Sequence, residues 1–361
     1  MKHVYALIMA GGRGQRIWPA SRLKNPKHLL SLWGKKTMLQ RTIERLSPMV
    51  NIGDTFVVTN RTHKNGVREQ IPRLAKENLI LEPFTKNTAA CIGLAALWML
   101  KRDPEAVMVV LPSDHIIKEK RKFHTVLSHA VSLAKSNGSL VTVGIVPRFP
   151  ATGFGYIKLG RPSGSSGGIR VFKVHKFMEK PNTNTAEYLI RSEKYLWNSG
   201  IFIWPAKSIL LAIRRHMPKL YMSLLRINKA LGTRRYAKVL KREYAALKDI
   251  SIDKGILERS PDIFTVSSDL KWDDVGSWSS LDYLGFCDKK RNLSIGEQFS
   301  IDTKDSILIT DKGRLLATIG LSGFIVVQSE DATLICAKER AQEVKELVKR
   351  LRASRKFKKY T

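Results

Sequence analysis

Three glycines directly after a short apolar run have the character of a phosphate-binding loop. The run at residues 4–9 predicts a buried parallel strand, and Gly11, Gly12 and Gly14 follow it. Glycine permits positive φ and lets backbone N–H groups come close to a ligand. A loop of this kind after a strand forms an anion-binding nest, so this stretch predicts contact with phosphate groups.

Cationic side chains surround this loop and indicate a ligand with several negative charges. They are Arg13, Arg16, Arg22, Lys24 and Lys27. The loop is not a Walker loop, because Gly14 is followed by Gln15 and Arg16 instead of Lys and Ser or Thr. It is not a dinucleotide fingerprint, because Ile17 stands where the third glycine belongs. The alternative is a glycine-rich turn with solvated cations.

An aspartate beyond a later strand is a candidate metal ligand. Residues 106–111 predict a buried strand, and Asp114 follows its end. Mg²⁺ is typically held by one or two carboxylates together with phosphate oxygens and water. The alternative is that Ser113 or Asp114 caps the lysine-rich helix that follows.

The segments that must position these side chains are predicted to alternate between strands and helices, which is an α/β pattern. Residues 79–81 predict a strand, and a buried helix is expected to begin near Thr88 with Asn87 or Thr88 as its N-cap. Glu82, Asn87 and Thr88 then lie in a strand-to-helix loop, where α/β folds bind ligands.

Length and composition predict a globular chain that is expected to be cytoplasmic. It has 361 residues, 43% of them hydrophobic, and no apolar stretch long enough to span a membrane or to act as a signal peptide. The net charge of +32 implies acidic partners or steering of anionic substrates. The charge is spread along the chain and no nucleic-acid module signature is present, so nucleic acid is not the expected partner.

The loop as a whole resembles the sugar-1-phosphate nucleotidyltransferases. Its pattern is G-G-x-G-x-R-x-x-P-x-S-R-x-x-x-P-K-x-x-L, and Trp18 before Pro19 with the PKHLL ending is most similar to the mannose-1-phosphate guanylyltransferase branch. The resemblance implies GTP as the nucleotide and mannose 1-phosphate as the acceptor. It implies binding of the triphosphate by the loop and of the base by the strand-to-helix loop, where Glu82 can accept from guanine's two donors. Alternatively, Glu82 only caps a helix or pairs with a lysine. The implied nucleotide-binding residues are Gly11, Gly12, Arg13, Gly14, Arg16, Lys27, Glu82, Asn87, Thr88 and Ser113.

Three further motifs resemble the sugar-binding part of that family. They are TGFGYI, FMEKP and WNSGIF, and they supply Gly153, Gly155, Glu179, Lys180 and Asn198. The glycine backbone would approach the sugar hydroxyls, Glu179 would accept from them and Lys180 would pair with the sugar's phosphate. The alternative is a Glu–Lys pair on a surface hairpin. Lys254 stands where the family has tyrosine, which departs from the pattern.

The resemblance also implies a second carboxylate on Mg²⁺. In the WDDVGSW motif, Asp274 matches the family's metal ligand and would meet Asp114, with Asp273 as the alternative ligand. Arg16, Lys27, Asp114 and Asp274 are therefore the residues expected to carry catalysis.

The fold class expected is α/β. A Rossmann-like, mainly parallel sheet is expected over residues 1–283, and short apolar strands with a final helix at 342–351 indicate a small β module over 284–361. By resemblance this module is a left-handed β-helix used in dimer contacts, so a homodimer is expected, without a fused isomerase domain. Alternative functions are another base or sugar choice, or a non-catalytic basic relative that binds nucleic acid.

Overall fold

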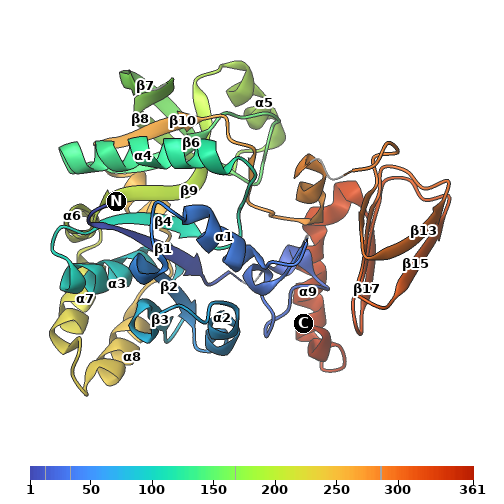
Figure 1. The fold of residues 1–361 in the computed structure, drawn as a ribbon, viewed down its shortest axis with the longest axis horizontal. Helices are drawn as coiled ribbons and strands as arrows, with labels where there is room; N and C mark the ends of the chain where they lie inside the picture. Colours follow the sequence, from blue (N-terminus) through green and yellow to red (C-terminus); the bar gives the residue numbers. More distant parts are fainter. Residues whose placement is uncertain (13, 33, 167, 285–286) are drawn as a thin grey trace.

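The computed structural model describes residues 1–361 except 13, 33, 167, 285 and 286, and its centre is one large sheet (Figure 1). The nine strands lie in the order β3–β2–β1–β4–β9–β6–β10–β8–β7. Strands β8 and β9 run antiparallel to their neighbours, and the others share one direction. The strands are β1 (Val4–Ala10), β2 (Thr55–Asn60), β3 (Leu79–Glu82), β4 (Val107–Pro112), β6 (Leu140–Ile145), β7 (Gly155–Ser166), β8 (Ile169–Glu179), β9 (Tyr195–Pro205) and β10 (Ile263–Ser268). The expected mostly parallel α/β sheet is confirmed.

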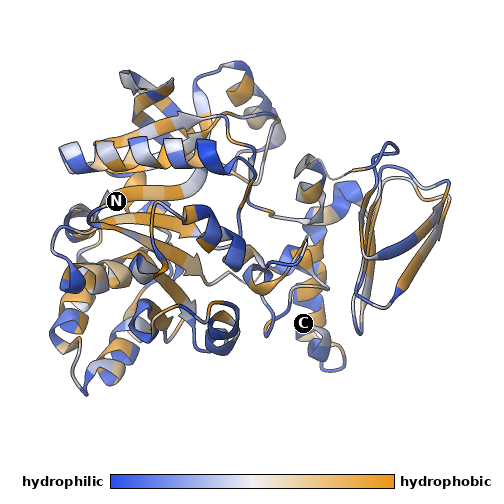
Figure 2. Cartoon of the chain, viewed as in Figure 1, coloured by the Kyte–Doolittle hydropathy of each residue, from blue (hydrophilic) through white to orange (hydrophobic). Residues whose placement is uncertain are grey.

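Helices cover both faces of this sheet because its strands are apolar on both sides. In β1, Ala6 and Ile8 pack into the core under α1, α2 and α4, while Leu7 packs into the core under α3, α6, α7 and α8. The helices are α1 (Met38–Leu46), α2 (Lys64–Gln70), α3 (Asn87–Arg102), α4 (Lys120–Asn137), α5 (Thr183–Arg191), α6 (Ala206–His216), α7 (Pro218–Ala230) and α8 (Tyr236–Ala246). Figure 2 shows apolar strands at the centre and hydrophilic residues on the outer sides of the helices.

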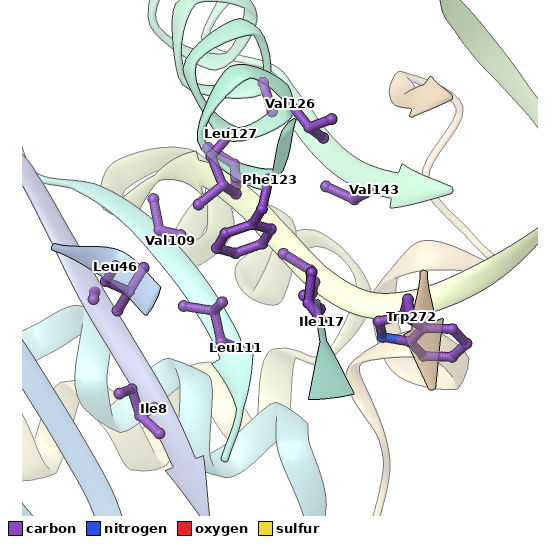
Figure 3. Packing of buried hydrophobic residues seen from close by; sticks show 14 of the residues in the cluster. Ile8, Leu46, Val109, Leu111, Ile117, Phe123, Val126, Leu127, Val143 and Trp272 are labelled. Atoms are coloured by element: carbon purple, nitrogen blue, oxygen red, sulfur yellow. The ribbon is translucent and has the colours of Figure 1, made fainter. Parts of the chain in front are cut away.

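One of these cores reaches the strand ends where the candidate site lies. Phe123 of α4 lies among Val109, Leu111 and Ile117 (Figure 3). Ile117 belongs to the short strand β5 (Ile116–Ile117), which pairs with β11 (Trp272–Asp273). This small ribbon is therefore anchored in the core, and it brings the segment after β4 beside the segment around residue 274.

The last part of the chain is a coil of short, mainly parallel strands followed by a helix, with the last strand antiparallel to its neighbour. Strands β12, β14 and β16 pair in parallel on one side, and β13 and β15 pair in parallel on another. Their bounds are β12 (Leu293–Ile295), β13 (Glu297–Ile301), β14 (Ile307–Thr310), β15 (Leu315–Ile319), β16 (Phe324–Gln328), β17 (Thr333–Ala337) and α9 (Val344–Ala353). The β-rich module is as expected, whereas its handedness and the boundary at 283/284 stay predictions.

Helix α9 packs between this module and the central domain. Figure 1 shows it between the central sheet and strands β13, β15 and β17. Val344 and Val348 pack into the same core as Ile17 and Trp18 of the glycine loop. The helix begins two residues later than expected, because residues 338–343 form a 3₁₀ helix.

Two helix starts differ from the sequence-based expectation. Helix α3 has Asn87 as its first residue, at φ +62°, and Lys86 precedes it as the cap. Glu119 precedes α4, so neither Ser113 nor Asp114 caps that helix. In the described part of the chain, no helix has the length and apolar character required to cross a membrane.

Candidate active site

The glycine loop borders a cavity of about 360 Å³, here called the loop cavity. It lies beyond the carboxyl ends of β1 and β4, which are neighbouring strands with Met9 beside Pro112. Residues from four separate parts of the chain line it: Gly14, Gln15, Arg16, Ile17, Lys27, Asp114, His115, Asp274, Val275, Gly276 and Lys345. All four residues expected to carry catalysis therefore share one cavity.

The glycine loop can adopt its shape only with glycine at position 14. Gly14 has φ +57°, and a Cβ there would lie 2.5 Å from Cβ of Lys27. Cβ atoms at Gly11 and Gly12 would meet nothing within 4 Å, so open space lies beside both residues. Bare backbone at these positions suits close approach of phosphate oxygens. Arg13 lies outside the described residues.

Lys27 holds the two candidate aspartates together. It is 5% exposed, and its Nζ lies 2.7 Å from Oδ2 of Asp114. The same Nζ donates to the carbonyl oxygen of Asp274 at 2.5 Å. Arg16 adds a second link, because its Nη1 donates to the carbonyl oxygen of Gly276 at 3.2 Å.

The pKa values of the two carboxylates are shifted in opposite directions. Burial is the largest single influence on Asp114 and acts to raise its pKa, but the charge and hydrogen bond of Lys27, with smaller contributions from His115 and His28, together bring the pKa below its usual value. Burial raises the pKa of Asp274, and the nearby Asp114 adds to this effect. A cation bound between them would relieve this repulsion.

Asp273 does not border the loop cavity. It is 4% exposed, and its Oδ1 accepts from the backbone N–H of Val275 at 2.5 Å. Burial, followed by the neighbouring Asp274 charge, raises its pKa to about 7. The geometry therefore favours Asp274 over Asp273 as the carboxylate available to a ligand.

The donor set in the loop cavity suits a hard divalent cation that shares its coordination with substrate oxygens. Carboxylate oxygens from Asp114 and Asp274 are the ligand type that such cations prefer. Within the described part of the chain, no group of three or more His, Cys, Asp or Glu side chains is arranged to hold a metal ion by itself. Two protein carboxylates with phosphate oxygens and water would complete such a site.

The residues expected to bind the sugar phosphate line a second cavity of about 200 Å³, here called the hairpin cavity. Gly153, Gly155, Glu179, Lys180 and Asn198 all border it. Asn198 donates from Nδ2 to Asp253 Oδ1 at 2.7 Å, which orients its amide at the cavity wall.

Glu179 is one of the acids that border this cavity, and two lysines lie near its carboxylate. Its Oε2 lies 3.1 Å from Nζ of Lys254, and its Oε1 lies 3.9 Å from Nζ of Lys180. The substitution of lysine for the family's tyrosine at position 254 therefore places an extra cation beside the candidate sugar-binding carboxylate. The hairpin β7–β8 does carry the Glu–Lys pair, but this pair faces a cavity.

His115 lines both cavities, as Asp274 does. Its Nδ1 lies 3.1 Å from Nε1 of Trp272, and an indole N–H can only donate. Burial lowers the His115 pKa to about 3, so the ring is neutral and its proton is on Nε2. Only the tertiary pairing of β5 with β11 reveals this position.

Gly11 and Gly12 do not border either cavity, and neither do four further candidate residues: Ser113, Asn87, Thr88 and Glu82. Ser113 is 2% exposed, and its carbonyl accepts from Thr42. Asn87 Nδ2 donates to Asp249, and Thr88 Oγ1 accepts from the N–H of Ile252. These two contacts fix the start of α3 against the segment before Asp253. A role for these residues in binding the base stays a prediction.

Glu82, the fourth, is buried at 6% exposure and its Oε1 has no hydrogen-bond partner. Burial raises its pKa to about 8, while a hydrogen bond with Tyr244 opposes the shift. The carboxyl is therefore neutral at pH 7. Neither alternative from the sequence, a helix cap or a lysine pair, is observed for Glu82 among the described residues.

Protein stability is expected to fall as the pH rises from about 4.5 to about 8, because Glu82 ionises readily only in the unfolded chain. Each pKa unit corresponds to about 1.4 kcal/mol, so the effect is on the order of a few kcal/mol. Urea unfolding across this range measures it. Glu82→Gln should flatten the profile, and the exposed Glu77→Gln should not. A Glu82→Gln profile parallel to that of the unmodified protein would contradict the assignment.

Comparison with known proteins agrees with this geometry. The chain matches the model of the family described as Nucleotidyl transferase over residues 5–284, and that of a MannoseP isomerase/GMP-like beta-helix domain over residues 296–351. Mannose-1-phosphate guanylyltransferases of Salmonella muenchen and Escherichia coli strain K12 are each 37% identical, over 98% and 97% of this chain and 74% of their own length. A solved structure described as a mannose-1-phosphate geranyltransferase from Thermus thermophilus has a TM-score of 0.87 at 34% identity, covering 97% of this chain and 99% of that one. Agreement over nearly the whole chain, in sequence and in backbone, shows that this chain belongs to the nucleotidyltransferase family, among the mannose-1-phosphate guanylyltransferases.

Proposed function

We propose that this chain transfers GMP from GTP to mannose 1-phosphate and so forms GDP-mannose and pyrophosphate. The observation that carries the proposal is the meeting of two cavities at His115 and Asp274. One cavity is bordered by a glycine loop and cations, which suit a triphosphate. The other is bordered by carboxylate, amide and bare glycine backbone, which suit a sugar.

The nucleophile is an oxygen of the acceptor's own phosphate. Its second pKa is near ~6, so the dianion predominates at neutral pH and no general base is required. This oxygen attacks the α-phosphorus of GTP in line, a P–O bond forms, and the bond to the β-phosphate oxygen breaks. The electron pair leaves with pyrophosphate.

The protein contributes position and charge to this step. Arg16 and Lys27 border the loop cavity and would neutralise the triphosphate, and Glu179 and Asn198 would orient the sugar. His115 would donate a hydrogen bond from its Nε2–H at the junction of the two cavities. Enzymes of this family generally use a divalent metal ion, and we propose Mg²⁺ between Asp114 and Asp274, where it would supply charge neutralisation.

A homodimer is also proposed, because strands β13 and β15 expose apolar side chains. Phe299, Ile301, Leu315 and Ile319 are 65%, 47%, 62% and 74% exposed. Paired strands place Ile301 beside Ile319, so these side chains form a continuous apolar surface. Light scattering of the purified protein measures the oligomeric state.

The cytoplasmic location stays a prediction from the sequence.

Pyrophosphate release tests the proposed function. Purified protein with Mg²⁺, GTP and mannose 1-phosphate should release it, whereas ATP, UTP, dTTP and glucose 1-phosphate should support much lower rates. Equal turnover with UTP and glucose 1-phosphate would instead indicate a different base and sugar choice. No turnover with any pair, together with salt-sensitive binding of DNA or RNA, would indicate a non-catalytic basic relative.

A further inference from the structure

Helix α9 places a lysine in the loop cavity. Lys345 borders this cavity together with Arg16, Lys27 and the two aspartates, although it belongs to the last part of the chain. It does not border the hairpin cavity. Lys345 lies outside the glycine-loop pattern and the other motifs, so the sequence alone does not indicate a role for it.

The position of Lys345 is held by packing on both sides of it along the helix. Val344 and Val348 are 3% and 1% exposed and share a core with Ile17 and Trp18. Before the helix begins, Gln342 Nε2 donates to Ser277 Oγ at 3.3 Å. Ser277 directly follows Gly276, which also borders the cavity. The side of α9 that carries Lys345 is therefore fixed against the loop cavity.

The ammonium of Lys345 is available for a ligand. It makes no hydrogen bond or ion pair with any residue that the structure describes. The acids beside it are engaged elsewhere: Glu343 pairs with Arg340, and Glu346 pairs with Lys349 and Arg350. Lys27 differs, because its ammonium already contacts Asp114 and the carbonyl of Asp274.

We propose that Lys345 binds the β- and γ-phosphates of the nucleotide, which leave together as pyrophosphate. This inference rests on the function proposed above. An in-line displacement puts the leaving group on the side of the α-phosphorus opposite the attacking oxygen. The acceptor enters from the hairpin cavity, so the leaving group lies in the part of the loop cavity remote from it. Lys345 borders only the loop cavity, and the last part of the chain thereby completes the substrate site.

The test compares Lys345→Met with Lys349→Met, one turn further along the same helix. Both substitutions remove one positive charge and keep an apolar stem, and Lys349 is exposed and pairs only weakly with Glu346. Lys345→Met is expected to raise KM for GTP about 10-fold, the loss typical of one hydrogen bond to a charged group. KM for mannose 1-phosphate should stay unchanged, and Lys345→Arg should restore GTP affinity to within about 3-fold of the unmodified protein.

Binding of pyrophosphate itself separates this inference from the proposed function. Calorimetry with pyrophosphate and Mg²⁺ requires no turnover, and Lys345→Met should weaken Kd about 10-fold. If the unmodified protein bound pyrophosphate but did not turn over, the proposed function would fail while the inference could still hold. Unchanged Kd and KM in Lys345→Met, or equal losses in Lys349→Met, would overturn the inference.

Discussion

Asp274→Asn should abolish turnover while the protein remains folded. The carboxylate borders both cavities and is one of two that suit a divalent cation. Losing a bound metal ion removes several kcal/mol of transition-state charge stabilisation. Because each ~1.4 kcal/mol corresponds to a tenfold change in rate, kcat should fall about 10³-fold. The fold should survive, because Oδ1 accepts from the N–H of Gly276 at 2.8 Å and asparagine offers the same acceptor.

Two measurements make the Asp274 result specific. Pyrophosphate release gives kcat, and calorimetry with Mn²⁺ and nucleotide gives metal affinity independently of turnover. Asp262→Asn is the matched control, since Asp262 is a surface acid with its side chain 76% exposed and paired to Lys173. If Asp274→Asn kept more than about a tenth of the activity, the metal role would have to pass to Asp273 or to another acid.

Lys27→Met should lower kcat about 10²–10³-fold, the loss typical of removing one preorganised group that stabilises developing charge. Methionine keeps the apolar stem of this buried side chain but removes the ammonium that contacts Asp114. The pKa of Asp114 should then rise, because Lys27 is the main group that lowers it against the effect of burial. The acid limb of the pH–rate profile should therefore move to higher pH.

The loss of activity in Lys27→Met is expected to follow from the lost charge and not only from changed packing. Lys27→Arg keeps the charge and should retain more activity than Lys27→Met, and the exposed Lys24→Met should behave as the unmodified protein. Thermal unfolding controls for the loss of the ion pair with Asp114. Equal activity in Lys27→Met and the unmodified protein would show that this ammonium does not contact the reacting phosphates.

Much of the local chemistry was readable from the sequence. The apolar run before Gly11 predicted a buried strand, and the strand extends to Ala10. Gly14 has the positive φ that a glycine loop requires. Such features depend on a few neighbouring residues, through steric limits and the period of apolar positions. The sequence predicted the start of α3 less well, because Asn87 is held there by a hydrogen bond to Asp249, which belongs to a distant segment.

The sequence by itself determined the residue types, the glycine loop and the α/β class with its β-rich C-terminal module. Only the tertiary structure decided that Asp114 and Asp274 share a cavity, because the β5–β11 pair brings them together. It also decided that Glu82 is buried and neutral and that His115 and Lys345 border the site. The physical reason is that backbone conformation follows local sterics and hydrophobic periodicity, whereas proximity and pKa depend on which distant segments pack together and exclude water.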